Sequence, residues 1–173
     1  MATNLEFIKS ETLTSSASQL LVTDCFNKGY NVYEIIITKE DRSATGYGEL
    51  RFLDSSGSEL TGGHYDLASL NIYSASGYSE VQKPNQTYFR DGINYQGTNS
   101  ADGSGIKLTI FNADNSSSYT FLTGQASTHY TGQFLTMAKT IGVYKQTATV
   151  YGIKWYPTSG TINGTKISVY GVK

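Results

Sequence analysis

Short apolar runs that alternate with polar residues recur along this chain, and they constrain its fold more than any other feature. The clearest run is residues 106–112, IKLTIFN, in which Ile106, Leu108 and Ile110 alternate with Lys107 and Thr109. Successive side chains of a β-strand point to opposite faces of its sheet, so a two-residue period predicts a strand with one buried face. We therefore expect the three aliphatic residues to face the interior.

Segments of this kind follow one another at the spacing of about 8 to 12 residues that is typical of β-sandwiches and barrels. In residues 64–73 a helical spacing also occurs, but Leu70 and Ile72 alternate with Asn71 and Tyr73. No helix cap precedes this segment, so we favour a strand there too. The expected strands are residues 4–9, 18–23, 30–38, 47–54, 64–73, 86–95, 106–112, 119–124, 128–137, 148–156 and 165–171.

Two of these segments show which side chains should share a face. In residues 30–38, Tyr33, Ile35 and Ile37 lie on one side of the predicted strand. In residues 47–54 the alternation sets Leu50 and Phe52 opposite Arg51 and Leu53.

The end of the chain repeats the tripeptide Val-Tyr-Gly, at residues 150–152 and 169–171. The spacer between the two runs contains Pro157, Gly160 and Gly164, which favour turns. We expect two neighbouring strands that close the sheet as a hairpin. A glycine inside a strand marks a bulge or a close approach of another backbone, and Gly152 and Gly171 fit that role.

Composition supports one all-β domain. Charged residues make up 16% of the 173 residues, below the ~25% of typical globular proteins, while Gly (18) and Tyr (14) are abundant. No Pro- or Gly-rich linker divides the chain. We predict an all-β, single-domain antiparallel β-sandwich, jelly-roll-like, over residues 16–173. Residues 1–15 form an N-terminal arm or first strand, and an arm could add a strand to a neighbouring subunit.

Charge and hydropathy argue against several partners. The net charge is −1, from 13 basic and 14 acidic residues, and no basic stripe of the kind that binds nucleic acid is visible. The longest aliphatic run is residues 35–37, whereas a membrane-spanning helix needs ~20 residues. Residues 1–11 lack the layout of a signal peptide, and the single Cys25 allows no intrachain disulfide. We expect neither nucleic acid nor membrane as partner, and synthesis in a reducing cytoplasm.

Residues that could carry catalysis are few. His64 and His129 are the two histidines, each beside a tyrosine, and we interpret both as surface or rim residues. Cys25 lies between Asp24 and Phe26 with no adjacent base, which favours a small buried hydrophobic residue over a nucleophile. We predict no enzymatic activity, no catalytic residue and no cofactor.

Acidic residues do not form a recognisable site either. Residues 99–105 and 112–118 are rich in oxygen donors, but neither has the regular acidic spacing of a calcium loop, and turn formation explains them equally well. Two histidines and one cysteine without close spacing make a zinc site improbable, so we predict no metal. The remaining candidates for an acid–base pair are scattered over the chain: Asp54, Glu59, Asp66, Asp91 and Asp102.

The tyrosines allow three interpretations. Tyr is a good sheet residue, it is enriched in subunit contacts, and when exposed it can stack on sugars. The sequence leaves all three open, so no binding residue is assigned.

Parts of the chain resemble virion structural proteins of tailed bacteriophages. The segments that carry the resemblance are residues 20–38, with Phe26, Tyr30 and Tyr33, residues 49–60, with Leu50-Arg51-Phe52 and Ser56-Gly57, the HYDL of residues 64–67, and residues 153–173. The resemblance implies a β-sandwich that is a component of a virus particle, assembled from protein made in the host cytoplasm.

The function we expect from this resemblance is non-enzymatic. The first choice is a capsid decoration or cement protein, a homotrimer that binds and stabilises the lattice of the major capsid protein. A tail-fibre or receptor-binding domain that recognises host glycan is the first alternative. A carbohydrate-binding module of a carbohydrate-active enzyme is the second.

Overall fold

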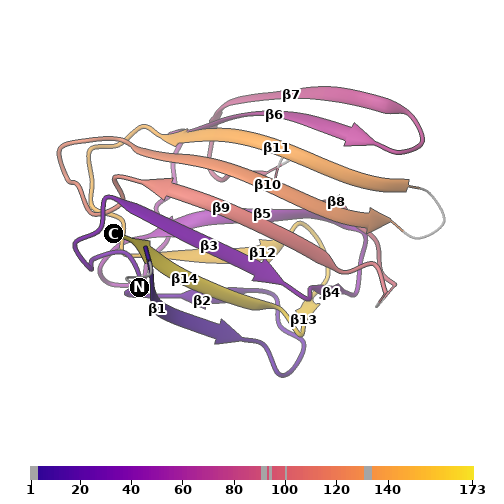
Figure 1. Ribbon diagram of the computed structural model, residues 1–173, viewed down its shortest axis with the longest axis horizontal. Helices are drawn as coiled ribbons and strands as arrows, with labels where there is room; N and C mark the ends of the chain where they lie inside the picture. Colours follow the sequence, from indigo (N-terminus) through magenta and orange to yellow (C-terminus); the bar gives the residue numbers. More distant parts are fainter. Residues whose placement is uncertain (1–3, 91–92, 94, 100, 131–133) are drawn as a thin grey trace.

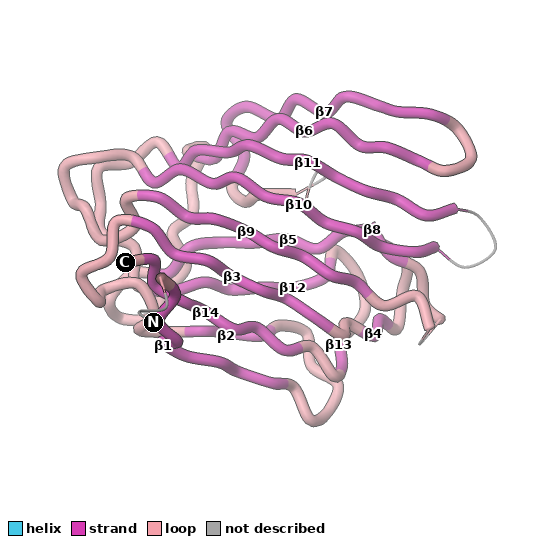
Figure 2. Tube along the Cα trace, viewed as in Figure 1, coloured by secondary structure: helices cyan, strands magenta, loops and turns pink. Residues whose placement is uncertain are grey.

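Two packed antiparallel sheets and a two-stranded ribbon make up the computed structural model, which describes residues 4–90, 93, 95–99, 101–130 and 134–173 (Figure 1). The larger sheet has the order β1-β14-β3-β9-β10-β11-β6-β7, the smaller one β2-β12-β5-β8, and the ribbon pairs β13 with β4. Strands and loops account for all of the described chain (Figure 2). The bounds are β1 Leu5–Thr12, β2 Leu20–Val22, β3 Val32–Thr38, β4 Asp41–Arg42, β5 Gly46–Leu53, β6 Tyr65–Tyr73, β7 Gly77–Gln86, β8 Tyr95–Gln96, β9 Ser104–Phe111, β10 Thr120–Tyr130, β11 Phe134–Tyr144, β12 Gly152–Pro157, β13 Ile162–Asn163 and β14 Lys166–Val172.

The core lies between the two sheets and is rich in aromatic rings. The largest fully buried side chains include Trp155, Tyr33, Phe26 and Phe52. Phe26 meets Tyr33 edge to face with ring centres 5.0 Å apart, an arrangement that aromatic quadrupoles favour. Sheets that pack face to face around such a core form a β-sandwich, so the predicted fold class is confirmed.

The predicted inner faces of β3 and β9 are confirmed. Tyr33, Ile35 and Ile37 are fully buried, and the aliphatic residues of β9 are at most 2% exposed. Leu53, expected opposite Leu50 and Phe52, is buried as well. The turn after β5 folds back onto it through a bridge between Leu53 and Glu59.

In the second half of β6 the faces are the reverse of what hydropathy suggests. Ser69 and Asn71 are buried, whereas Leu70 and Ile72 are 42% and 44% exposed. The strand begins with Tyr65 inside the core, and the two-residue period then fixes the direction of every later side chain.

Three strand predictions need correction. Residues 128–137 were expected as one strand, but they span the end of β10 and the start of β11, which pair antiparallel with Tyr130 opposite Phe134; residues 131–133 lie outside the described part. Residues 86–95 do not form one strand: β7 ends at Gln86 and β8 starts at Tyr95, and residues 91, 92 and 94 lie outside the described part. Strand β7, with its charges and proline, carries no strong alternation of apolar residues and was missed.

The prediction that the last two strands form a closing hairpin is also wrong. β12 lies in the smaller sheet, between β2 and β5, and β14 lies in the larger one, between β1 and β3. The turn-rich spacer therefore carries the chain from one layer to the other. The interpretation of Gly152 is confirmed, because a Cβ there would lie 2.4 Å from the Val22 carbonyl oxygen. At Gly171 the close neighbour is a side chain, since a Cβ there would lie 2.6 Å from the Tyr30 ring.

The first and last strands of the chain lie side by side (Figure 1). β1 pairs antiparallel with β14 of the same chain, and the Lys173 amide donates a hydrogen bond to the Asn4 carbonyl at 2.9 Å. Of the two alternatives for residues 1–15, this pairing makes residues 5–12 a first strand; residues 1–3 lie outside the described part.

A buried ion pair joins the end of β3 to the smaller sheet. The Glu40 carboxylate accepts hydrogen bonds from Arg42 Nε at 2.5 Å and from Trp155 Nε1 at 2.5 Å. Arg42 Nη1 also donates to the Gly46 carbonyl at 2.5 Å. Glu40 and Arg42 have fully buried side chains, so each charge depends on the other for compensation.

Candidate functional site

One surface of the larger sheet leaves an unusual amount of apolar side chain in water. We call it the outer face: the side of β9, β10, β11, β6 and β7 that is turned away from the smaller sheet. Ile141 at its centre is 62% exposed and Tyr78 is 72% exposed. The large apolar residues of the outer face are Leu70, Ile72, Tyr78, Phe121, Leu135, Met137 and Ile141, each exposed by 42% or more.

This patch follows from strand register. Residues of β11 and β6 that face each other include Ile141 with Ala68 and Met137 with Ile72. The residues that alternate with these pairs along β6 and β11 face the interior of the sandwich. Because side chains of a strand alternate between its two faces, Ile141, Met137 and Ile72 face solvent. A contiguous apolar patch on a protein surface marks an interaction site more often than isolated exposed residues do.

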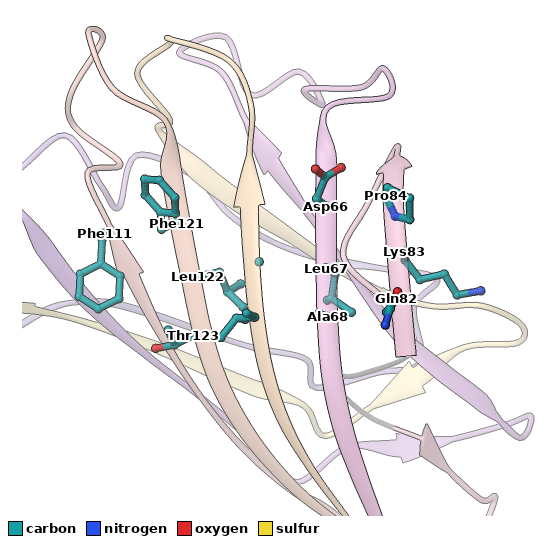
Figure 3. A pocket seen from close by; sticks show the side chains of 12 residues that line it. Asp66, Leu67, Ala68, Gln82, Lys83, Pro84, Phe111, Phe121, Leu122 and Thr123 are labelled. Atoms are coloured by element: carbon teal, nitrogen blue, oxygen red, sulfur yellow. The ribbon is translucent and has the colours of Figure 1, made fainter. Parts of the chain in front are cut away.

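A groove of about 560 Å³ crosses one end of the outer face. Figure 3 shows Phe111 and Phe121 on one side of it and Lys83 and Pro84 on the other, with β6 between them. Ala68 contributes only a methyl group to its floor. Two further depressions adjoin it, and Ile141 lines all three.

The rim of the groove is polar. The Asp66 carboxylate accepts a hydrogen bond from the Asn85 backbone amide at 2.7 Å and pairs with Lys145 at 2.9 Å. Partial burial opposes ionisation of Asp66, but the Asn85 amide and the Lys145 ammonium outweigh it and lower its pKa. The rim is therefore charged at neutral pH, whereas the patch beside it is apolar.

The open edges of the larger sheet differ from its outer face. Edge strand β7 carries Glu80, Lys83 and Pro84, and edge strand β1 carries Glu6 and Lys9 beside the exposed Leu5 and Phe7. Charges and proline on edge strands disfavour pairing with the strands of another chain. Contact through the outer face is therefore better supported than contact through an edge.

The candidate catalytic residues are dispersed. Cys25 is fully buried and its Sγ donates to the Val22 carbonyl at 3.4 Å; burial raises its pKa to about 12. His64 is partly buried, and its Nε2 lies 3.1 Å from Nε2 of the Gln146 side chain. His129 is half exposed, and its Nδ1 lies 3.1 Å from buried Asp102. This last pair, between β10 and a loop, was not foreseen.

The other acidic candidates lie apart. Glu59 pairs with Arg51 and Lys154 on the outside of the smaller sheet, and Asp54 caps the turn after β5. Asp91 lies outside the described residues. Among the residues with described positions, no group of three or more His, Cys, Asp or Glu side chains could hold a metal ion. Within the same residues, no helix is long and apolar enough to cross a membrane.

Several tyrosines have structural partners within the chain. Tyr33, Tyr65 and Tyr144 belong to the core. On the smaller sheet, Tyr88 and Tyr156 are contacted by cations: Arg90 lies 4.7 Å from the Tyr88 ring centre and Lys154 lies 4.7 Å from that of Tyr156. Cation–π contacts of this kind occupy ring faces that a sugar would need.

Comparisons with known proteins identify no family. No protein-family model and no curated protein matches the chain. The crystal structure of exo-inulinase from Aspergillus awamori aligns over 96% of this chain with 10% identity and a TM-score of 0.45. The VP2 subviral particle of infectious bursal disease virus aligns over 98% with 14% identity and a TM-score of 0.19. The chain spans 29% of the exo-inulinase chain and 42% of the VP2 chain, and likenesses at these TM-scores do not establish a common fold.

Proposed function

We propose that this chain is a non-enzymatic structural subunit that works by binding other protein chains through its outer face. The observation that carries the proposal is the cluster of seven large, exposed apolar side chains on neighbouring strands. Covering such a patch removes apolar surface from water at about 25 cal/mol per Å², which favours association. The charged edges of the same sheet leave the face as the surface for contact.

The more specific proposal is that the chain decorates the capsid of a tailed bacteriophage and stabilises the lattice of the major capsid protein. The resemblance of residues 20–38 and 153–173 to virion structural proteins supports it. A net charge of −1 is compatible with many copies packed on one particle, because it creates little repulsion between them. The protein would be made in the host cytoplasm and act in the virion.

Binding to empty capsid shells tests the decoration role. The purified protein should co-sediment with shells and raise their melting temperature, because a ligand that binds only the assembled state stabilises it. Replacing Ile141 by Lys should abolish this effect. Leu5→Lys, at a position 49% exposed on edge strand β1 of the same sheet, is the matched control and should bind normally. Folded protein that fails to bind shells contradicts the decoration role.

A tail location is the alternative within the virion. Copy number per purified particle separates the two, with hundreds of copies expected on a shell and a handful in a tail.

Glycan binding is a second candidate because of the groove. Its wall carries the rings of Phe111 and Phe121, and polar groups of Gln82 and Asp66 lie across from them. Aromatic faces with hydrogen-bonding groups opposite are a suitable surface for a sugar chain. Calorimetric titration with host-surface polysaccharide tests this candidate, and Phe121→Ala should weaken any binding.

A further inference from the structure

The outer face is patterned in rows that run across three strands. The pairing of β6 with β11 on one side and with β7 on the other fixes which residues share a row. In each row the middle residue belongs to β6. The three rows are Met137–Ile72–Tyr78, Lys139–Leu70–Glu80 and Ile141–Ala68–Gln82.

The middle row has opposite charges at equal distances from its centre. Lys139 and Glu80 flank Leu70, each one strand away, which is about 4.8 Å. Both side chains are exposed, and neither forms an ion pair with another residue in the described part of the chain. A cation and an anion placed symmetrically about an axis are self-complementary under a two-fold rotation.

A two-fold axis that lies in the contact plane and runs along β6 would form the pair between Lys139 and Glu80 twice. The rotation places β11 of one copy over β7 of the other, so that Lys139 meets Glu80 on both sides of the axis. Leu70 and Ile72 would then meet their own equivalents at the centre.

The neighbouring row fits the same arrangement. Met137 would lie over Tyr78, and a thioether against an aromatic ring is a favourable contact. Ile141 of one copy would lie over Gln82 of the other. Both residues line the same depression of the outer face, together with Ala68. One axis therefore gives complementary contacts in charge and in shape.

The area of the surface indicates how tightly two copies should associate. β6, β7 and β11 have nine, ten and eleven residues, or roughly 30 Å of length, and three strands are roughly 15 Å wide. The projected area is about 450 Å² per copy, before the relief of the side chains is counted. Stable interfaces bury about 800 Å² of accessible surface per partner. This contact therefore belongs at the lower end of the range of interface areas, where association is reversible.

We propose that, in protein not bound to shells, the occupant of the outer face is a second copy of this chain, packed face to face about a two-fold axis along β6. This inference rests on the proposed function, because it names the partner of the association surface. It specifies a dimer through one surface, in place of the trimer expected from the resemblance. Two sheets in this arrangement would pack about 10 Å apart, as the layers of a sandwich do.

Light scattering and sedimentation equilibrium on the purified protein, without shells, test the dimer. Between about 1 and about 100 µM the mass should rise from 18.9 kDa towards twice that value. Lys139→Glu and Glu80→Lys should each weaken dimerisation roughly tenfold or more, because each turns two attractive pairs into repulsive ones. Lys166→Glu, at an exposed position on β14 and outside the face, is the matched control and should leave dimerisation unchanged.

Mixing the two charge variants is the decisive measurement. Each repels itself, but a Lys139→Glu copy and a Glu80→Lys copy would form two correct ion pairs with each other, so heterodimers should appear at close to the parental affinity. Mixing Glu80→Lys with Lys166→Glu matches the change in net charge and should not restore full affinity. Circular dichroism melts of every variant confirm that each is folded.

The outcomes separate this inference from the proposed function. A monomer at every concentration, or single variants that mixing does not rescue, overturns the two-fold dimer even where shells are still bound. A rescued dimer that binds no shell supports the inference and removes the capsid role.

Discussion

Replacing Gly152 by Ala should destabilise the protein, because the added methyl group would collide with the backbone of a neighbouring segment. Gly152 begins β12, and a Cβ there would lie 2.4 Å from the Val22 carbonyl oxygen and 3.0 Å from the Thr23 Cα. Both atoms belong to backbone, so no side-chain rotation can relieve the clash. Since ordinary contact begins at 3.4 Å, β2 and β12 must separate by about 1 Å.

The magnitude follows from what that separation disturbs. β2 pairs with β12 through Ile153–Val22 and Trp155–Leu20, and Ile153 and Trp155 are fully buried. Overpacking a core typically costs about 1–3 kcal/mol, and movement of paired backbone places this case near the upper end. For a chain of this length each kcal/mol lowers the melting temperature by about 2–4 °C. We expect a loss of about 3 kcal/mol and of about 6–12 °C.

Urea unfolding followed by tryptophan fluorescence measures this loss. Gly105→Ala is the matched control, because Gly105 also lies in a strand, has no neighbour within 4 Å of an added Cβ and has an ordinary φ. The control should be neutral or more stable by up to about 1 kcal/mol, since alanine restricts the unfolded chain. If Gly152→Ala unfolds within about 0.5 kcal/mol of the parent, the close approach of β2 and β12 is wrong.

Three further changes test other parts of the structure. Glu40→Gln should cost about 3–5 kcal/mol in urea unfolding, because it leaves Arg42 buried without its counter-charge; an unchanged midpoint would argue against the ion pair. Glu59 is partly desolvated, but hydrogen bonds from Lys154 and Arg51 lower its pKa in the folded state, so its stabilising contribution is complete above the unfolded value and is lost as pH falls through the folded one. The parent should therefore lose more stability than Glu59→Gln between about pH 6 and about pH 3, and parallel losses would contradict this. Cys25 should react with a thiol reagent in native buffer only at the rate of unfolding, because it is buried and its pKa is raised to about 12; rapid labelling of native protein would show that it is accessible.

Local patterns in the sequence were enough to predict most strands and several buried faces. Ile106, Leu108 and Ile110 are buried as their alternation predicts, and Gly152 has the close backbone neighbour that a strand glycine suggests. These features depend on the two-residue period and on the absence of a side chain. Strand β7 and the separation of β10 from β11 were missed because the residues there carry no strong contrast between apolar and polar positions.

The site could not be predicted in the same way. The sequence shows Leu70 and Ile72 as apolar residues of a strand, which would ordinarily point inward, but the structure turns them outward and buries Ser69 and Asn71. Which face of β6 is covered depends on the smaller sheet, and its strands come from distant parts of the chain. The candidate interaction surface arises only from that packing.

The sequence by itself determined that this chain forms many short strands with alternating faces, because a two-residue period is a local property of the backbone. Only the tertiary structure decided that β12 and β14 belong to different sheets, and that β11, β6 and β7 present Ile141, Leu70 and Tyr78 to solvent. Sheet partners are chosen by the burial of surfaces far apart in the sequence, and no local pattern records that choice.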